Sequence, residues 1–437
     1  MLRSRRIFYG WWIVVGGFII QLLVGALLFH PFGLYVVKLE EEFGWSRTRL
    51  SIAFSLARVE DGLLGPLQGW LLDRFGPRIV MATGVLIFGF GFFAFARMNS
   101  LTTFYVTFVV MAIGAALAGF LSVTTAIVNW FVRRRTMAVG IGLIGVAFGG
   151  LLQPGMAALL DSVGWRGTSI ISGVIVLAVG LPASLLVRHR PEPYGLLPDG
   201  DTAPPPAASA DGAPAGAVAT AAPEVSFTPR EALRARSFWL ISAAHAAALL
   251  VVSAVQVHFV AHVKELLDYS SGEAALFISA LTVMTIVGQL SGGWLGDRFS
   301  SRLLIGICML GHGAALLLLT FASSAFMVLG FTVLHGLAWG VRGPVILSMR
   351  AEYFGRASYG MIMGLSSLVV ATGMVIGPVL AGAIYDATGS YEVGFTILAV
   401  VAAVSSLLMV FVSRPQLPIR AQPPAPELAP AAARADG

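Results

Sequence analysis

Residues 69–78 read Gly-Trp-Leu-Leu-Asp-Arg-Phe-Gly-Pro-Arg, and residues 293–302 read Gly-Trp-Leu-Gly-Asp-Arg-Phe-Ser-Ser-Arg. Each stretch closes an apolar run with a charged turn. The second begins 224 residues after the first, and the same offset relates Pro154 to Pro378 and Gly140 to Gly364. This repetition predicts a chain made of two similar halves.

The composition indicates that both halves lie in lipid. Of the 437 residues, 57% are hydrophobic and 11% are charged, and the mean hydropathy is +0.84. A soluble domain carries about 25% charged residues. Twelve apolar runs are close to or longer than the roughly 20 residues that a helix needs to cross a bilayer. They cover 8–36, 48–72, 79–97, 101–131, 136–161, 166–187, 237–263, 272–296, 302–322, 325–349, 357–385 and 391–413.

The sequence therefore predicts an all-α membrane protein with twelve transmembrane helices in two pseudo-symmetric six-helix bundles. The bundles span residues 1–187 and 237–414, and a linker covers 188–236. From Pro198 to Pro223 this linker is rich in Ala, Pro and Gly and is expected to be disordered, as is the tail 415–437. Residues 230–236 are expected to form either a short amphipathic helix on the membrane surface or a plain loop.

Basic residues predict the topology, because loops on the cytoplasmic side carry an excess of Lys and Arg. Both termini and the linker are expected in the cytoplasm. The only lysines, Lys38 and Lys264, are expected outside. The preference for arginine favours a bacterial source, and hence the inner membrane. The cytoplasmic set is Arg3, Arg5, Arg6, Arg74, Arg78, Arg133, Arg134, Arg135, Arg188, Arg190, Arg230, Arg234, Arg236, Arg298, Arg302, Arg350, Arg356, Arg414, Arg420 and Arg434.

These observations exclude several classes of protein. The pI of 9.8 does not indicate nucleic-acid binding, because the arginines lie in short loops between apolar runs. The single cysteine, Cys308, allows no disulfide framework. No nucleophile and base constellation, metal cluster or ATP-binding GxxxxGK[ST] loop is present. We therefore expect neither an enzyme nor a cofactor.

The repeated stretch has a physical logic. Gly69 and Gly293 allow close helix packing, and Asp73 and Asp297 can accept hydrogen bonds from arginines or from a helix N-terminus. Such a cluster could hold two helices in one conformation and release them in another. The plainer alternative is a set of charges that marks the membrane edge. The residues of this predicted conformational latch are Gly69, Asp73, Arg74, Arg78, Gly293, Asp297, Arg298 and Arg302.

This stretch resembles the Gly-x-x-x-Asp-Arg-x-Gly-x-Arg loop of the major facilitator superfamily, with Ser300 where the second copy should have glycine. Residues 130–149, which begin Trp-Phe-Val-Arg-Arg-Arg-Thr-Met-Ala-Val-Gly, resemble a signature of its monocarboxylate and oxalate transporter branch. The resemblance implies two bundles that rock around a central cavity, and we expect a monomer.

Two departures from that branch affect the expected site. Residues 8–12 lack the acidic residue usual before the first helix, and 272–296 contain no arginine. Gln289 stands about where that arginine is expected. A lactate-type binding site cannot be transferred directly.

Four charged residues lie inside predicted helices, where each costs about 2.5–3.5 kcal/mol on insertion scales. Arg58 and Asp61 have the spacing of an ion pair on one helix face, and Glu60 lies beside them. Arg342 shares a helix face with His335 and Trp339. Its guanidinium could bind a substrate carboxylate. Alternatively it could pair with Glu60 or Asp61.

The candidate site residues combine these charged residues with polar and aromatic side chains of the predicted helices. The substrate-binding set is Arg342, His335, Trp339, Arg58, His30 and Gln289, and the proton-coupling set is Glu60, Asp61 and His258. We expect His245 and His312 to be satisfied core residues.

The sequence predicts a secondary transporter that moves a small organic anion, most simply a monocarboxylate, together with protons. One alternative is proton-driven efflux of a drug-like or cationic solute by way of Glu60 and Asp61. Another is a membrane sensor with a transporter-like body.

Overall fold

The structure is a computed structural model that describes residues 7–201, 226–267, 269 and 271–416. Within these ranges the side chains of 47, 48, 51, 54, 55, 58, 59, 61 and 271–275 are not described. Most of the expected linker disorder, the tail from 417 onward and the arginines at 3, 5, 6, 420 and 434 lie outside the described residues.

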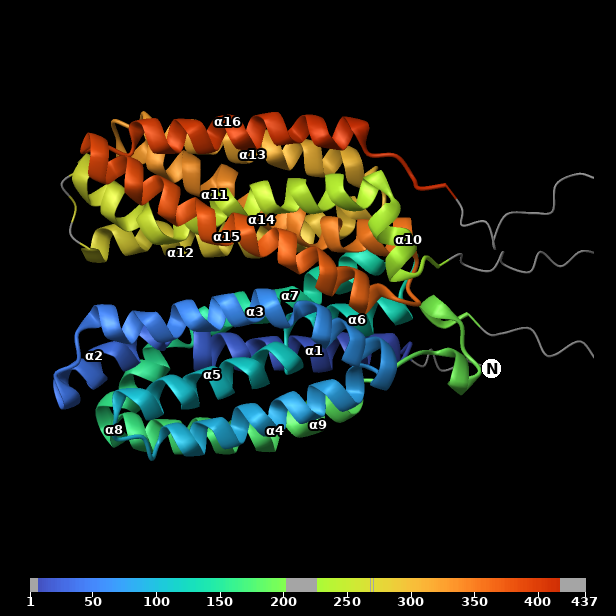
Figure 1. Cartoon of the computed structure of the whole chain (residues 1–437), viewed down its shortest axis with the longest axis horizontal. Helices are drawn as coiled ribbons and strands as arrows, with labels where there is room; N and C mark the ends of the chain where they lie inside the picture. Colours follow the sequence, from blue (N-terminus) through green and yellow to red (C-terminus); the bar gives the residue numbers. More distant parts are fainter. Residues whose placement is uncertain (1–6, 202–225, 268, 270, 417–437) are drawn as a thin grey trace, which may run out of the picture.

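The described chain folds into two helical bundles that lie side by side (Figure 1). The first contains α1 (Gly10–Val24), the π-helical turn η1 (Gly25–Phe29), α2 (Phe32–Phe43), α3 (Arg47–Phe75), α4 (Pro77–Phe95), α5 (Leu101–Ala118), α6 (Phe120–Trp130), α7 (Arg135–Leu151), α8 (Gln153–Ile175), η2 (Val176–Gly180) and α9 (Leu181–Leu186). The second contains α11 (Arg236–Leu267), α12 (Ser271–Gly296), α13 (Ser301–Thr320), α14 (Ala325–Phe354), α15 (Tyr359–Thr388) and α16 (Glu392–Phe411).

Ten helical stretches are long and apolar enough to cross a membrane, with α7 as a shorter apolar helix and the 29-residue α3 beside them. Together they correspond to the twelve predicted spans, and the fold is that of a multi-pass membrane protein. The fifth and sixth predicted spans are separated at Gly164, inside α8, where φ is 68° and ψ is 172°. Only glycine adopts such a conformation readily.

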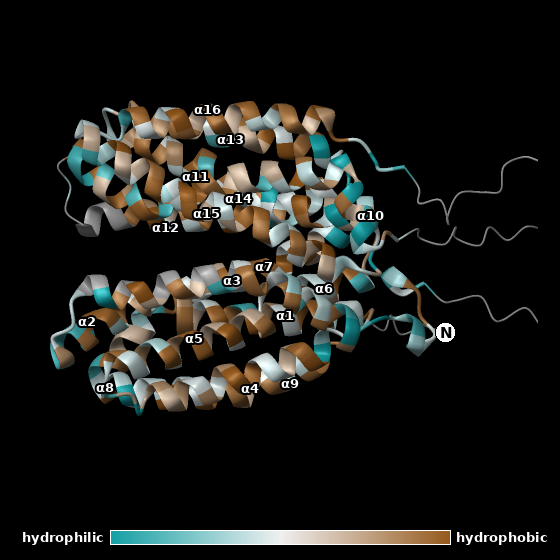
Figure 2. Cartoon of the chain, in the orientation of Figure 1, coloured by the Kyte–Doolittle hydropathy of each residue, from teal (hydrophilic) through white to brown (hydrophobic). Residues whose placement is uncertain are grey.

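Lipid explains the surface of both bundles. Large apolar side chains such as Leu63, Phe90 and Val410 are 66%, 59% and 72% exposed. Hydrophobic residues run along the helices, and hydrophilic residues gather towards the ends of the bundles (Figure 2). This pattern is expected where hydrocarbon surrounds the helices and water meets only their ends.

One end of the molecule, which we call the linker end, carries residues 188–201, 226–228 and 412–416 (Figure 1). Part of the linker is ordered here. The predicted disorder is wrong for 198–201, because Pro198–Gly200 form a 3₁₀ turn. The helix expected within 230–236 forms as α10 (Pro229–Arg234), which begins with a capping box between Thr228 and Glu231.

Candidate functional site

The predicted latch residue Asp73 lies at the linker end of α3 and binds the opposite bundle. Its carboxylate accepts hydrogen bonds from the backbone amides of Gly360 at 3.0 Å and Met361 at 2.9 Å. These amides belong to the first turn of α15, which has no intrahelical partner for them. A carboxylate here also interacts favourably with the helix dipole.

Asp297 forms the matching contact in the other direction. At the end of α12, it accepts hydrogen bonds from the amides of Thr136 at 2.8 Å and Met137 at 3.2 Å, in the first turn of α7. The 224-residue offset that relates the two aspartates also relates residues 136 and 360. Each bundle therefore caps one helix of the other.

The glycines of the repeated stretch allow these helices to approach. A Cβ atom at Gly69 would overlap the carbonyl oxygen of Gly360, and one at Gly293 would lie 2.8 Å from the Cα of Met137. Both contacts would be closer than non-bonded atoms can lie. The close packing predicted for these glycines is confirmed, and their partner is the opposite bundle.

The arginines of the motif play other roles. Arg74 and Arg78 are exposed. Arg298 lies over the ring of Trp294 at 4.0 Å, and Arg302 donates to the carbonyl oxygen of Val412 at 2.8 Å. Of the two partners that the sequence left open for the aspartates, the helix N-terminus is the one found.

The ordered part of the linker, residues 188–201, also joins the two bundles. Glu192 pairs with Arg356 of the α14–α15 loop, and Arg190 donates to the carbonyl oxygen of Ala357 at 3.3 Å. Asp199 accepts from the amides of Val132 at 3.2 Å and Arg133 at 3.0 Å, just before α7. No sequence motif marked these contacts, because they depend on the fold of an apparent loop.

Burial lowers the pKa of the His189 imidazole in this segment, and the neighbouring Arg190 lowers it further. His189 is therefore neutral at pH 7. Its carbonyl oxygen accepts a hydrogen bond from Asn129 at 3.1 Å.

Arg342 lies in the middle of α14 and is 1% exposed. Its Nε and Nη1 atoms are buried and have no hydrogen-bond partner among the described residues. No described acidic side chain forms an ion pair with it, so the predicted alternative of pairing with Glu60 is not found in this conformation. Leaving such donors unsatisfied costs about 1–3 kcal/mol each, and more for a charged group.

Two buried histidines lie within electrostatic range of this arginine. The Nδ1 atoms of His312, on α13, and His335, on α14, are 3.2 Å apart. The side chains are 0% and 1% exposed, and neither Nε2 atom has a partner within the described chain. The expectation that His312 is satisfied is therefore wrong for its Nε2. A sequence cannot show that residues on two different helices share a hydrogen bond.

A second buried arginine on the same helix provides a contrast. Arg350 donates to Ser366 at 2.9 Å and contacts the Nδ1 of His245 at 3.1 Å. Ser366 in turn lies 2.8 Å from Ser242. The assignment of Arg350 to a cytoplasmic loop is wrong, because α14 continues to Phe354 and buries it. His245 is bound as expected.

The other predicted substrate residues are spread over both bundles. Trp339 is half-buried on α14, and the buried Oε1 of Gln289 on α12 has no described partner. The exposed His30 bonds through Nε2 to the carbonyl oxygen of Val146 at 2.9 Å. No hydrogen bond joins these three side chains to Arg342 in the described chain.

Among the proton candidates, Glu60 is half-buried on α3, while the side chains of Arg58 and Asp61 lie outside the described residues. His258 on α11 has both ring nitrogens occupied. Its Nε2 donates to the carbonyl oxygen of Pro378 at 2.9 Å, and its Nδ1 accepts from the hydroxyl of Tyr391 at 3.1 Å. An additional proton on His258 would require one of these bonds to rearrange.

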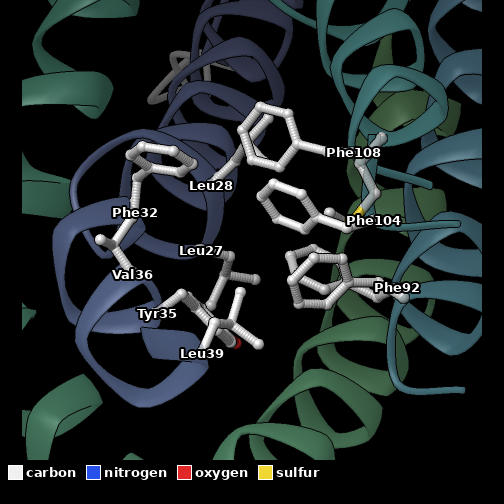
Figure 3. A pocket seen from close by; sticks show the side chains of 11 residues that line it. Leu27, Leu28, Phe32, Tyr35, Val36, Leu39, Phe92, Phe104 and Phe108 are labelled. Carbon is white, nitrogen blue, oxygen red and sulfur yellow. The ribbon is translucent and has the colours of Figure 1, made fainter. Parts of the chain in front are cut away.

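The described structure also contains two cavities. An apolar one between α2 and α5 has a volume of about 10 Å³, which is too small for a solute, and Figure 3 shows Leu27, Phe92 and Phe104 around it. A polar cavity of about 620 Å³ at the linker end includes Asp297, Arg302 and Glu352. The latch residues Asp297 and Arg302 therefore form part of its wall.

Two bundles of membrane-spanning helices that cap one another through matched aspartates define a two-bundle membrane transporter. The chain belongs to the Major Facilitator Superfamily, whose sequence profile matches residues 13–262 and 242–435. It is 25% identical over 393 residues to monocarboxylate transporter 13 of Bos taurus, covering 89% of this chain and 86% of the relative. It is 27% identical over 408 residues to monocarboxylate transporter 11 of Mus musculus, covering 89% and 84%.

Solved structures share the fold. A proton:xylose symporter aligns with a TM-score of 0.70 at 15% identity, over 93% of this chain and 96% of the symporter. The fucose:proton symporter of E. coli gives 0.66 at 16% identity, over 92% and 98%. A human organic anion transporter gives 0.63 at 15% identity, over 91% and 98%. The predicted fold and superfamily are confirmed, and the chain is a transporter rather than an enzyme.

Proposed function

We propose that this transporter carries a small organic anion, most simply a monocarboxylate, by alternating access. The observation that supports the proposal most is the Arg342 guanidinium, which is buried and has no described partner for Nε and Nη1. The monocarboxylate transporters to which the chain is similar agree with this substrate class.

The argument rests on the cost of a buried charge. An unpaired guanidinium in a water-poor interior is unfavourable, whereas a carboxylate can accept two parallel hydrogen bonds from it. Arg350, eight residues further along α14, already has protein partners and needs no ligand. Arg342 is therefore the arginine that a solute would complete.

The latch supports the transport cycle. Asp73 and Asp297 cap helices of the opposite bundle and so join the bundles at the linker end, which supports a cycle in which this conformation keeps that end closed. Release of both caps would let that end open and expose the solute to the other side of the membrane. A proton gradient is the simplest driving force. We propose a monomer in a bacterial inner membrane, with the linker end in the cytoplasm.

Uptake by the purified full chain in proteoliposomes tests this function. Radiolabelled pyruvate, L-lactate and benzoate would be supplied with and without a pH gradient that is alkaline inside. We expect saturable uptake of at least one of these acids, and loss of that uptake in Arg342→Gln. Arg414→Gln, an exposed arginine of the same bundle, is the matched control and should remain active. Transport of a cationic dye but of no carboxylate would contradict the proposal and favour drug efflux.

A further inference from the structure

The His312 and His335 pair has a hydrogen-bonding pattern with consequences for protonation. When both imidazoles are neutral, only one of the two Nδ1 atoms carries a hydrogen, and it donates to the other across 3.2 Å. The donor ring then has a bare Nε2 lone pair, and the acceptor ring has an Nε2–H. Both Nε2 atoms are buried and have no partner in the described part of the chain.

One added proton changes what this pair offers to a ligand. The proton would occupy the bare Nε2, so that both Nε2 atoms become donors while the Nδ1 to Nδ1 bond is kept. The neutral pair presents one donor and one lone pair that repels an anion. The protonated pair presents two donors and a positive charge, which suits a carboxylate.

We propose that the His312 and His335 pair is the proton-binding site of the transport cycle, and that its proton binds together with the organic anion at Arg342. This inference rests on the proposed function. It assigns the proton to α13 and α14 in place of the earlier candidates Glu60, Asp61 and His258. The step is a simple proton transfer to an imidazole nitrogen, with solvent as the donor and acceptor on the two sides of the membrane.

The charges around the pair explain why proton and anion would bind together. Arg342 lies close enough to interact electrostatically with both histidines, and Cys308 and Arg350 lie close enough to interact with Arg342. His245 on α11 is the next titratable group and is bound to Arg350. No described acidic side chain pairs with any member of this cluster. A proton on the pair without an anion would therefore add a second uncompensated positive charge within electrostatic range of Arg342, which is unfavourable.

The reverse also holds, because coupling between two binding sites is reciprocal. An anion at Arg342 compensates the guanidinium charge and so removes the repulsion that opposes protonation of the pair. One proton would thus accompany one monocarboxylate. The pair is closed to solvent in this conformation, so exchange of the proton requires the same conformational change as exchange of the solute.

The test uses the full chain in proteoliposomes with whichever of pyruvate, L-lactate or benzoate the native protein carries best. Two quantities are measured: accumulation driven by a pH gradient, and exchange of labelled for unlabelled acid at equal pH, which needs no net proton movement. A pH-sensitive dye inside the vesicles reports protons moved per carboxylate. The variants are His312→Gln and His335→Gln, with His262→Gln as the matched control, because His262 is also buried in this bundle but binds the carbonyl oxygen of Leu319.

We expect His312→Gln and His335→Gln to lose accumulation by about 10-fold or more and to move no protons with the solute, while exchange stays within about 3-fold of native. His262→Gln should keep both activities. Persistence of proton-coupled accumulation in either variant would overturn the inference but leave the proposed function intact. If a variant loses exchange as well, binding of the labelled acid at pH 5.5 and pH 7.5 decides: a native-like increase in affinity at the lower pH counts against the pair, and its disappearance supports it. If the native chain carries none of these acids, the proposed function itself fails.

Discussion

The carboxylate of Asp73 accepts a hydrogen bond from the backbone amide of Gly360 at 3.0 Å, so that α3 of one bundle caps α15 of the other. Asp297 caps α7 in the same way through Thr136 at 2.8 Å. These reciprocal contacts connect a repeated sequence motif to the joining of the two bundles at the linker end.

The first prediction concerns this cap. Asp73→Asn keeps an acceptor oxygen but removes the charge that interacts with the helix dipole. The cap should then stabilise the contact between the bundles by about 0.5–2 kcal/mol less. We expect turnover to slow while equilibrium solute binding stays nearly native, as measured by uptake rates and by binding to the purified protein. Asp297→Asn should behave alike, because the two caps are related by the repeat. Abolished binding in a well-folded Asp73→Asn protein would show that the residue touches the solute.

The second prediction concerns close packing between the bundles. In Gly69→Ala the new methyl group would overlap the carbonyl oxygen of Gly360 and should favour separation of the linker end. Spin labels on Ile79→Cys and Leu303→Cys, exposed positions that the repeat relates, measure this separation. The distance should lengthen in Gly69→Ala. It should not change in Gly155→Ala, because no atom lies within 4 Å of a Cβ at Gly155. An unchanged distance in both variants would contradict the proposed role of this contact.

The third prediction separates a structural histidine from the proton site. His258→Ala removes the partners of Pro378 and Tyr391, so the free energy of unfolding should fall by about 1–3 kcal/mol. Tyr391→Phe, which removes only the hydroxyl, should have a smaller effect. The ratio of protons to solute should remain native in both. Loss of proton coupling in His258→Ala at native stability would restore His258 as a proton carrier.

The fourth prediction concerns orientation in the membrane. The arginine asymmetry predicts that the linker end lies in the cytoplasm. A membrane-impermeant maleimide should label Ala387→Cys on intact cells and Ser413→Cys only after permeabilisation, in a Cys308→Ser background. Both positions are exposed; Ala387 lies in the last turn of α15, and Ser413 follows the end of α16. Labelling of Ser413→Cys on intact cells would reverse the topology.

The sequence predicted the helices well because lipid imposes a simple rule on length and hydropathy. Local glycine chemistry explains the turn at Gly164, which separates the fifth and sixth spans. The aspartate caps were predicted only in part. The charge of Asp73 and its possible helix partner could be inferred, but the identity of that partner, 287 residues away, depends on how the bundles dock.

The candidate site shows the same limit. The depth of Arg342 in its span followed from the apolar residues around it. His312, which lies within electrostatic range of it, belongs to another helix. Arg350 appeared to lie in a loop because α14 continues five residues beyond the apolar run that ends at 349. Side-chain partners across helices have no periodic signal in a single sequence.

The central claim is that Arg342 supplies the positive charge for an anionic solute. Equilibrium binding of the best-carried monocarboxylate and of its uncharged amide, to native protein and to Arg342→Lys and Arg342→Gln, tests it most directly. We expect native protein to bind the acid and not the amide. Binding of the acid should weaken in Arg342→Lys, which lacks the planar fork, and by about 100-fold or more in Arg342→Gln, which corresponds to roughly 3 kcal/mol. Equal affinity of native and Arg342→Gln proteins for the acid, or recovery of binding when Glu60 or Asp61 is neutralised together with Arg342, would contradict the account and make Arg342 a structural residue.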